Sequence, residues 1–313
     1  MERWSYFIKN KALFGSFPDQ EAVNHLEGIG VRCFIDLTLR DETNTKPYKT
    51  NYKYINYPIQ DRKTPKDWKS FAQLILEICR DIEKLENDEK LYIHCKGGHG
   101  RSGILVACIL CYYHNLNTEL ALKYTAQYHS ERPLLKEKWK KIGSPQGKKQ
   151  KDFVHNFFRP LYYELKKNKP IFCLNNNSDH PVTIPDVGTF PSAHFAYLSF
   201  KEYINDEYIH SLMNGKYIHH FVKSDEEAEN KWNENKVYYM YRVLELKFRQ
   251  NPMLIDFLLN TGLRPLVKVS SNSFWGDGSS DDRKIVGKNF HGKILCRLRN
   301  IFFHEDYLNS KYN

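Results

Sequence analysis

The chain has 313 residues, of which 41% are hydrophobic and 27% are charged, and this length and composition suit two globular domains with a core each. It contains no run of about 18 apolar residues, which argues against a membrane-spanning helix, and its seven cysteines at irregular spacing argue against a disulfide framework. The net charge of +10 is unevenly placed, since residues 1–170 carry 30 Lys and Arg against 20 Asp and Glu, whereas residues 171–313 carry 17 of each, so the first half favours anionic partners.

The first 60 residues predict a small α/β arrangement. Leu13 to Ser16 and the buried-type run Val31 to Thr38 are expected to form strands, and Gln20 to Glu27 has the apolar spacing of a helix. Tyr52 to Pro58 alternates and predicts a further strand. Strands and helices in this alternation indicate βαβ units around a mostly parallel sheet.

The next long element is a helix over Trp68 to Glu86, because apolar residues recur there at helical spacing. A short apolar run, Leu91 to Ile93, then precedes the sequence HCKGGHGRSG, and a longer apolar run follows from Ile104. We therefore expect residues 94–103 to join the end of a strand to the start of a helix.

The loop over residues 96–101, called the glycine-rich loop below, has the chemistry of an anion site. Its glycines let consecutive backbone N–H groups turn toward one point, and a helix N-terminus adds positive potential. Arg101 supplies a planar fork for two phosphate oxygens. Cys95 at its base is expected to carry a stabilised thiolate, which is a phosphoryl-accepting nucleophile. The alternative is a buried structural cysteine in a glycine-rich turn.

The combination of His-Cys, five residues and Arg-Ser-Gly resembles the signature of cysteine-dependent tyrosine and dual-specificity phosphatases. The segments LFGSFP, GIGVRCFIDLT and INYPIQD follow the same family order. The resemblance implies an N-terminal α/β phosphatase domain in which Cys95 is the nucleophile and Ser102 assists the leaving sulfur. The phosphate is expected to be held by Lys96, Gly97, Gly98, His99, Gly100 and Arg101.

Phosphoryl transfer from an ester also needs an acid that protonates the leaving oxygen. In the resembling family this acid is an aspartate on a loop upstream of the nucleophile, and Asp61 lies in such a loop. Asp67 is the rival, but it precedes Trp68 and is expected to be an N-terminal helix charge. Asp61 is therefore the predicted acid, the alternative being a solvated loop carboxylate.

The phosphatase domain is predicted to span 1–167. A helix is expected over Thr118 to Tyr128 and another after Ser144, and Gln146 or Gln150 is a candidate for positioning the hydrolytic water. The charged, proline-ended segment 166–170 predicts the domain boundary.

The second domain, predicted at 171–313, has helical segments at Pro191 to Lys201, Met240 to Phe248 and Pro252 to Leu259, followed by Gly-rich turns at 273–278 and 286–293. The segments KFRQNPMLIDFLLNTG, SFWGDG and GKNFHGKILCRLR resemble the NADAR superfamily, whose fold is mainly α-helical and whose members include N-glycosidases. The resemblance implies a ribosyl or nucleotide pocket lined by His194, Trp275, Asp277 and Asn289, with Lys201 at the family's lysine position.

This chain departs from that family at two positions. His194 and Lys268 stand where the family usually has glutamates. Carboxylates stabilise the oxocarbenium-like state of glycoside cleavage, so their replacement puts the activity in question. Lys201 remains able to attack an anomeric carbon as an amine. A second hypothesis is a protein that binds phosphate and ADP-ribose, or acts as a scaffold, without turnover.

The predicted partners are anionic. The first domain is expected to take a phosphorylated protein, a nucleotide, an RNA end or an inositol phosphate, and the second an ADP-ribose or ribosyl-phosphate compound. No metal and no cofactor are required by this chemistry. The N-terminus lacks a signal-peptide pattern, so we expect an intracellular protein, in the cytoplasm or nucleus, of a host cell if the source is a virus.

Overall fold

The computed structural model describes residues 3–164, 169–201, 205–217, 226–278 and 287–312. The chain divides into two compact units, Met1–Arg159 and Pro160–Asn313. This division precedes the linker expected at 166–170, because Leu161–Tyr163 pairs with a strand of the second unit.

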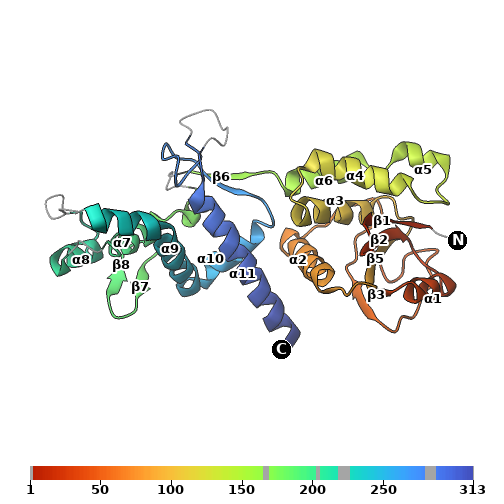
Figure 1. Cartoon of the computed structure of the whole chain (residues 1–313), viewed down its shortest axis with the longest axis horizontal. Coiled ribbons are helices and arrows are strands. Elements are labelled where there is room, and N and C mark those ends of the chain that lie inside the picture. The colour runs from red at the N-terminus through yellow and green to blue at the C-terminus, as the bar shows by residue number, and fades with distance from the viewer. Residues whose placement is uncertain (1–2, 165–168, 202–204, 218–225, 279–286, 313) are drawn as a thin grey trace. The chain divides into compact units, whose positions relative to one another are not determined.

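The first unit is built on a five-stranded sheet (Figure 1). Its strands are β1 (Trp4–Ile8), β2 (Ala12–Ser16), β3 (Val31–Asp36), β4 (Lys53–Asn56) and β5 (Lys90–Cys95), in the order β1-β2-β5-β3-β4. Only β1 is antiparallel to its neighbour within this sheet. The mostly parallel α/β sheet predicted from the sequence is confirmed, whereas β1 was not predicted.

Helices cover both faces of this sheet. The first, α1 (Gln20–Gly28), is capped by Asp19 and packs Val23 and Leu26 against Phe34 and Tyr92. The others are α2 (Trp68–Lys84), α3 (Arg101–Tyr113), α4 (Thr118–Ser130), α5 (Glu137–Ile142) and α6 (Lys148–Phe157). Helix α3 is the central one, since it contacts β2, β5, α2, α4 and α6.

The register of the sheet brings three strand ends together. Ser16 at the end of β2 pairs with Cys95 at the end of β5, and Asp36 at the end of β3 pairs with His94. Because parallel strands end at one edge, the loops that follow β2, β3 and β5 meet around Cys95. The glycine-rich loop lies at this edge and leads directly into α3.

The second unit is mainly helical, as predicted. Its elements are β6 (Leu161–Tyr163), the 3-10 helix η1 (Pro170–Leu174), β7 (Val182–Ile184), β8 (Gly188–Phe190), α7 (Ala193–Leu198), α8 (Asp206–Met213), α9 (Glu226–Gln250), α10 (Pro252–Asn260), β9 (Leu266–Lys268) and α11 (Phe290–Tyr312). Strands β6 and β9 are parallel, and β7 and β8 form a hairpin. Buried apolar residues of α9, α10 and α11 form its core.

One expected turn in this unit is wrong. Residues 290–293 belong to α11 rather than to a Gly-rich turn. Asn289 precedes the helix with φ of 48°, and a Cβ on Gly292 would lie 2.0 Å from the Leu266 carbonyl oxygen. Gly292 is therefore needed for the close approach of α11 to β9, and its glycine does not mark a turn.

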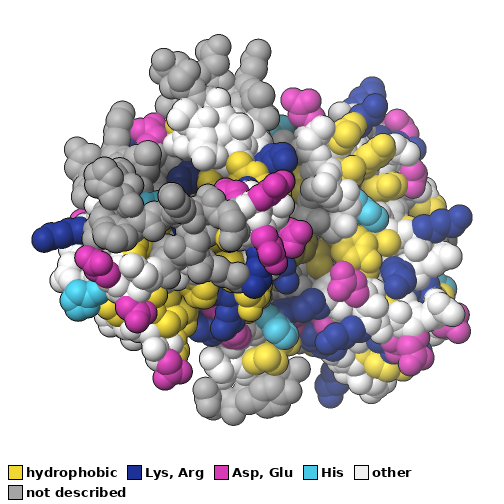
Figure 2. All heavy atoms as spheres, turned by 60° about the vertical axis from the view of Figure 1, so that its left-hand side comes forward, with side chains coloured by type: hydrophobic (Ala, Val, Ile, Leu, Met, Phe, Trp, Pro, Cys, Tyr) yellow, Lys and Arg dark blue, Asp and Glu magenta, His cyan; other side chains and the backbone are white. Residues whose placement is uncertain are grey.

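Within the described ranges, the helices are all too short or too polar to cross a membrane. The face drawn in Figure 2 carries Lys and Arg side chains interspersed with Asp and Glu side chains and with hydrophobic patches. Both signs of charge therefore share this face.

Candidate active site

The glycine-rich loop has the conformation of an anion-binding loop. The backbone N–H groups of residues 96–100 have no hydrogen-bond acceptor among the residues that the structure describes. Gly98 has φ of +73°, and a Cβ on it would lie 2.5 Å from the Gly15 backbone. A side chain at this position would disturb both the loop and β2, so the free N–H groups depend on glycine here.

Cys95 lies at the base of this loop and is 3% exposed. Its Sγ is 3.6 Å from the hydroxyl of Ser102, in the first turn of α3. The structure thus brings together the predicted nucleophile, its predicted helper and the predicted anion loop. His94, directly before Cys95, is buried and bonded to the Tyr48 hydroxyl at 2.7 Å, and burial lowers the pKa of its imidazole to about 4, so it is neutral at physiological pH.

Arg101 is held by two acidic residues from loops after β3 and β4. Its Nη1 and Nη2 atoms each donate to one oxygen of Glu42 at 2.6 Å, and Nη2 also donates to Asp61 Oδ1 at 3.1 Å. The Ile59 carbonyl accepts a further bond at 2.9 Å. Although burial opposes it, the hydrogen bond to Glu42 and the nearby negative charges raise the pKa of Arg101 above its usual value.

Glu42 was missed by the sequence analysis. Burial raises the pKa of this carboxyl, but the hydrogen bond and the charge of Arg101 outweigh it and lower the pKa below the usual value. The only sequence signal is the acidic pair Asp41-Glu42 in the loop that follows a buried strand. Since that strand ends beside β5, its loop was placed to reach the site.

The two aspartates that competed for the acid role have different surroundings. The exposed side chain of Asp61 contacts Arg101, as described above. Asp67 accepts bonds from the backbone N–H groups of Lys69 and Ser70 at 2.8 and 3.3 Å and is the N-cap of α2. The geometry therefore favours Asp61 as the acid and gives Asp67 a structural role.

Gln150 adjoins the same site. Its side chain accepts a bond from the Gly147 N–H at 3.1 Å and donates to the Lys63 carbonyl at 3.3 Å, in the loop that carries Asp61. A Cβ on Gly100 would lie 2.8 Å from its amide. Gln146 instead contacts the loop through its backbone N–H, which donates to the His99 carbonyl. Gln150 is thus the better placed candidate for orienting a water.

His99, one of the predicted phosphate-binding residues, adds no positive charge to the loop. Its Nδ1 lies 2.8 Å from Nε2 of His129, and its ring stacks on Trp139 at 4.2 Å. Burial and the charge of Arg132 lower the pKa of His99 to about 4. A neutral imidazole therefore forms part of the wall beside the loop.

The second unit holds a separate polar group around Lys268. The Lys268 ammonium donates to Asn176 Oδ1 at 2.7 Å, and the Asn176 amide lies 3.2 Å from His194 Nδ1. Burial lowers the pKa of Lys268 to about 8. Burial, followed by the charges of Lys268 and Lys201, lowers that of His194 to about 4. The charges of Lys201 and Lys268 thus both act on His194.

The other predicted pocket residues of this unit contact either the backbone near β9 or a group of aromatic rings. The Asn289 side chain bridges the Lys268 N–H and the Leu266 carbonyl and so supports the β9 backbone, and Asp277 Oδ1 accepts from the Ser270 N–H just after this strand. Trp275 packs edge-on against Tyr197, whose ring also contacts Trp232. Lys201 Nζ lies 5.4 Å from the centre of the Trp232 ring. Aromatic and cationic groups therefore adjoin each other here.

Two family models match this chain. Residues 2–142 match the phosphatase domain described as "Swiss Army Knife protein, DSP-PTPase phosphatase domain", and residues 161–302 match the NADAR domain. The dual-specificity-type phosphatase domain and the NADAR domain inferred from the sequence are both confirmed.

Several known proteins are similar to it. The putative tyrosine phosphatase 197R of Invertebrate iridescent virus 6 is 33% identical over 302 residues, which cover 94% of this chain and 89% of that protein. N-glycosidase R617 of Acanthamoeba polyphaga mimivirus is 36% identical over 76 residues, 22% of this chain and 45% of that protein. Among solved structures, Tk-PTP in its active form has a TM-score of 0.38 and 22% identity, covering 49% of this chain and 95% of that one.

Proposed function

This chain belongs to the family of the viral putative tyrosine phosphatase 197R and is a hydrolase of the dual-specificity type fused to a NADAR domain. On this premise we propose that its first domain hydrolyses phosphate monoesters through a phosphocysteine at Cys95. The observation that carries the proposal is the set of backbone N–H groups in residues 96–100, the residues that directly follow Cys95, that have no acceptor within the described part of the chain. Such a loop binds a phosphate dianion over a nucleophile.

The first step transfers the phosphoryl group to sulfur. The thiolate of Cys95 attacks phosphorus, the ester P–O bond breaks, and the leaving oxygen takes a proton from Asp61. Asp61 now contacts Arg101, and a bound phosphate would compete for the same Nη2 atom.

The second step releases phosphate. A water molecule attacks the phosphocysteine, Asp61 takes the proton of that water, and the S–P bond breaks. Ser102, 3.6 Å from the sulfur, donates to the departing thiolate. Gln150 adjoins both Gly100 and the loop of Asp61, where it can orient the attacking water.

Glu42 holds the guanidinium in place for both steps, so Glu42→Gln should lower kcat/KM for an aryl phosphate about tenfold, because a bidentate charged contact is lost. Steady-state hydrolysis of p-nitrophenyl phosphate measures the effect, and Asp41→Asn, a change at the exposed neighbouring residue, is the matched control. An unchanged kcat/KM in Glu42→Gln would rule out this role.

For the NADAR domain we infer hydrolysis of an N-glycosidic bond in an ADP-ribosyl or ribosyl-phosphate compound. The inference is supported by the domain match and by the similarity to N-glycosidase R617. The cations Lys268 and Lys201 suit the phosphate of such a compound, and the aromatic rings beside Lys201 suit its base or ribose.

Replacing Lys201 by alanine is expected to stop the release of ADP-ribose and free base from ADP-ribosyl substrates by the full chain while phosphatase activity persists. The measurement is chromatography of ADP-ribosyl substrates after incubation, with calorimetry of ADP-ribose binding in parallel, and exposed Lys216→Ala is the control. Binding of ADP-ribose by the wild-type protein without any product would instead establish a binding module.

A further inference from the structure

A cavity of about 220 Å³ adjoins the glycine-rich loop. Gly97 and His99 of the loop form part of its wall, and its other polar lining residues are Ser16 and the three cations Arg3, Arg132 and Lys136. None of the described residues that line this cavity is an aspartate or a glutamate. The cavity therefore has three cations and shares its wall with the site of hydrolysis.

Arg132 is the most informative of these residues because it is only 3% exposed. Its Nη1 donates to the Gly98 carbonyl at 2.8 Å, and its guanidinium lies over the Phe14 ring at 4.3 Å. Its Nε and Nη2 atoms have no hydrogen-bond partner among the described residues. A buried guanidinium is costly unless an anion compensates its charge, and here the described residues supply no carboxylate partner.

The electrostatic interactions of Arg132 also favour an anion beside it. Burial lowers the pKa of Arg132 to about 10, and electrostatic interaction with the nearby Tyr92 and Cys95 side chains opposes this shift. The guanidinium is thus close enough to the catalytic sulfur to interact with it. An anion held in the cavity would further compensate the positive charge of the Arg132 guanidinium.

The wall of the cavity is fixed, and its rim is cationic. The stacked rings of His99 and Trp139, and the bond from His99 to His129, hold one side in place. Arg3 and Lys136 are exposed, so their side chains are free to close on a ligand. A preformed wall with cations at the rim favours a dianion over a neutral group.

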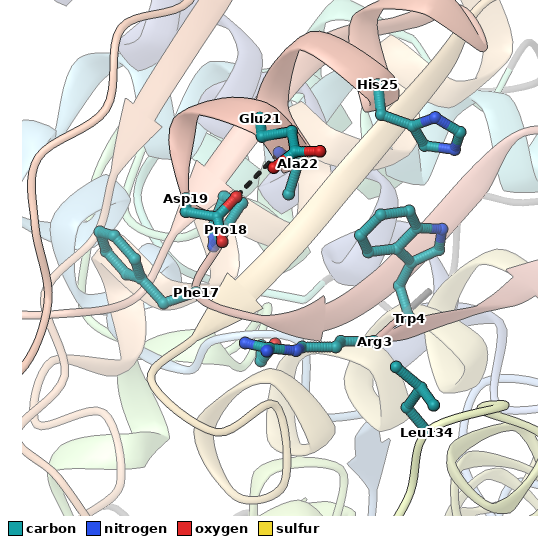
Figure 3. Close-up of a pocket in the computed structure, with 10 residues that line it drawn as sticks. Arg3, Trp4, Phe17, Pro18, Asp19, Glu21, Ala22, His25 and Leu134 are labelled. Atoms are coloured by element: carbon teal, nitrogen blue, oxygen red, sulfur yellow. Dashed lines mark hydrogen bonds between the residues drawn. The ribbon is translucent and has the colours of Figure 1, made fainter. Parts of the chain in front are cut away.

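A second cavity, of about 340 Å³, continues from the first and shares Arg3, Ser16 and Leu134 with it. Figure 3 shows Arg3 along one side of this cavity, with the rings of Trp4 and His25 and the acidic Asp19 and Glu21 around it. The carboxylates disfavour an anion there. The two cavities together therefore place the anion next to the loop and leave the larger space for an uncharged part of a ligand.

We propose that the cavity lined by Arg3, Arg132 and Lys136 binds a second phosphate group of the substrate, so that the preferred substrate is a small molecule with two phosphates. One phosphate occupies the glycine-rich loop and is hydrolysed, and the other is held in the cavity without reacting. The proposal rests on the phosphatase function proposed above and adds the substrate class. The second phosphate could belong to a polyol bisphosphate, in which the hydrolysed group is a monoester, or to a nucleoside diphosphate, in which the terminal P–O–P bond breaks and the remaining phosphate leaves; both present a second phosphate beside the reacting one.

The test is the double variant Arg3→Ala/Lys136→Ala of the full chain, with Lys141→Ala, an exposed change on the same helix α5 outside the cavity, as the matched control. We measure kcat/KM for an inositol bisphosphate with phosphates on adjacent carbons, for a nucleoside diphosphate and for p-nitrophenyl phosphate. For either the inositol bisphosphate or the nucleoside diphosphate, kcat/KM relative to that for p-nitrophenyl phosphate should fall about tenfold in the double variant, through a rise in KM. That bisphosphate identifies the source of the second phosphate.

Unchanged ratios for both bisphosphates would overturn the proposal. A calorimetric measurement separates this result from a failure of the phosphatase function itself. In a Cys95→Ser background, where turnover is not needed, the bisphosphate should bind more tightly than the aryl phosphate, and the double variant should remove the difference. Equal binding of both compounds to Cys95→Ser would overturn the second subsite even if the wild-type enzyme is an active phosphatase.

Discussion

Replacing Cys95 by serine is expected to lower the hydrolysis of aryl phosphates by at least about 10⁴-fold, because a serine hydroxyl does not ionise to a nucleophile in this loop. The fold should be retained, since the two side chains have similar size and the position is the end of a buried strand. Steady-state assays and circular dichroism of the full chain measure both properties.

The other cysteines of the first domain provide the control. Burial raises the pKa of Cys33, Cys79 and Cys111 to about 12, so these thiols remain protonated at physiological pH. Cys111→Ala should therefore keep its phosphatase activity. Wild-type activity in Cys95→Ser would remove Cys95 from the mechanism, and loss of activity in Cys111→Ala with the fold intact would show that the effect is not specific to Cys95.

The second large effect is expected for Asp61→Asn, which should lower kcat for an alkyl phosphate about 100-fold. The amide cannot protonate the leaving oxygen, and an alkoxide is a poor leaving group without a proton. The loss should be much smaller for p-nitrophenyl phosphate, because its phenolate leaves readily. The ratio of these two rates is the measurement, since a general disturbance of the site would lower both equally.

Asp67→Ala is the matched control for Asp61. Asp67 caps α2 with two backbone bonds, so its loss should reduce the free energy of unfolding by about 1 kcal/mol. The dependence on the leaving group should remain as in the wild-type enzyme. If Asp67→Ala, and not Asp61→Asn, lost activity toward the alkyl phosphate much more than toward p-nitrophenyl phosphate, the acid would be Asp67.

Elements with a local sequence signal were predicted correctly. A strand, a glycine-rich loop and a helix are consecutive in the chain, so Cys95, Arg101 and Ser102 could be placed together from spacing and chemistry alone. The strands β2, β3 and β4 and the helices α1 and α2 were likewise readable from apolar periodicity. The short β1 was not predicted, because five residues at the chain start show no clear alternation.

What the sequence could not provide are contacts between distant residues. Glu42 meets Arg101 across 59 positions, and Arg132 meets Gly98 across 34. Neither residue stands in a recognisable motif. The neutral state of His99 depends on its burial beside Trp139 and Arg132, which a list of residues does not reveal.

In the second domain, too, contacts between residues far apart in the sequence could not be predicted. Asp277 and Asn289 were predicted to line a pocket. The Asn289 side chain bonds to the backbone of β9, and Asp277 Oδ1 accepts from the Ser270 N–H just after β9. Polar residues in Gly-rich turns serve either purpose, and only the pairing of β9 with its surroundings distinguishes them. His194, Lys201 and Lys268 lie near one another although they come from α7, the turn after it and β9.

The most direct test of the central claim is a rapid acid quench of the wild-type enzyme during turnover of an aryl phosphate, followed by mass spectrometry of its peptides. Our account predicts a single phosphoryl group on the peptide that contains Cys95, attached to sulfur, and none on that peptide in Cys95→Ser. A phosphoryl group on another residue, or turnover without any phosphorylated peptide, would contradict it.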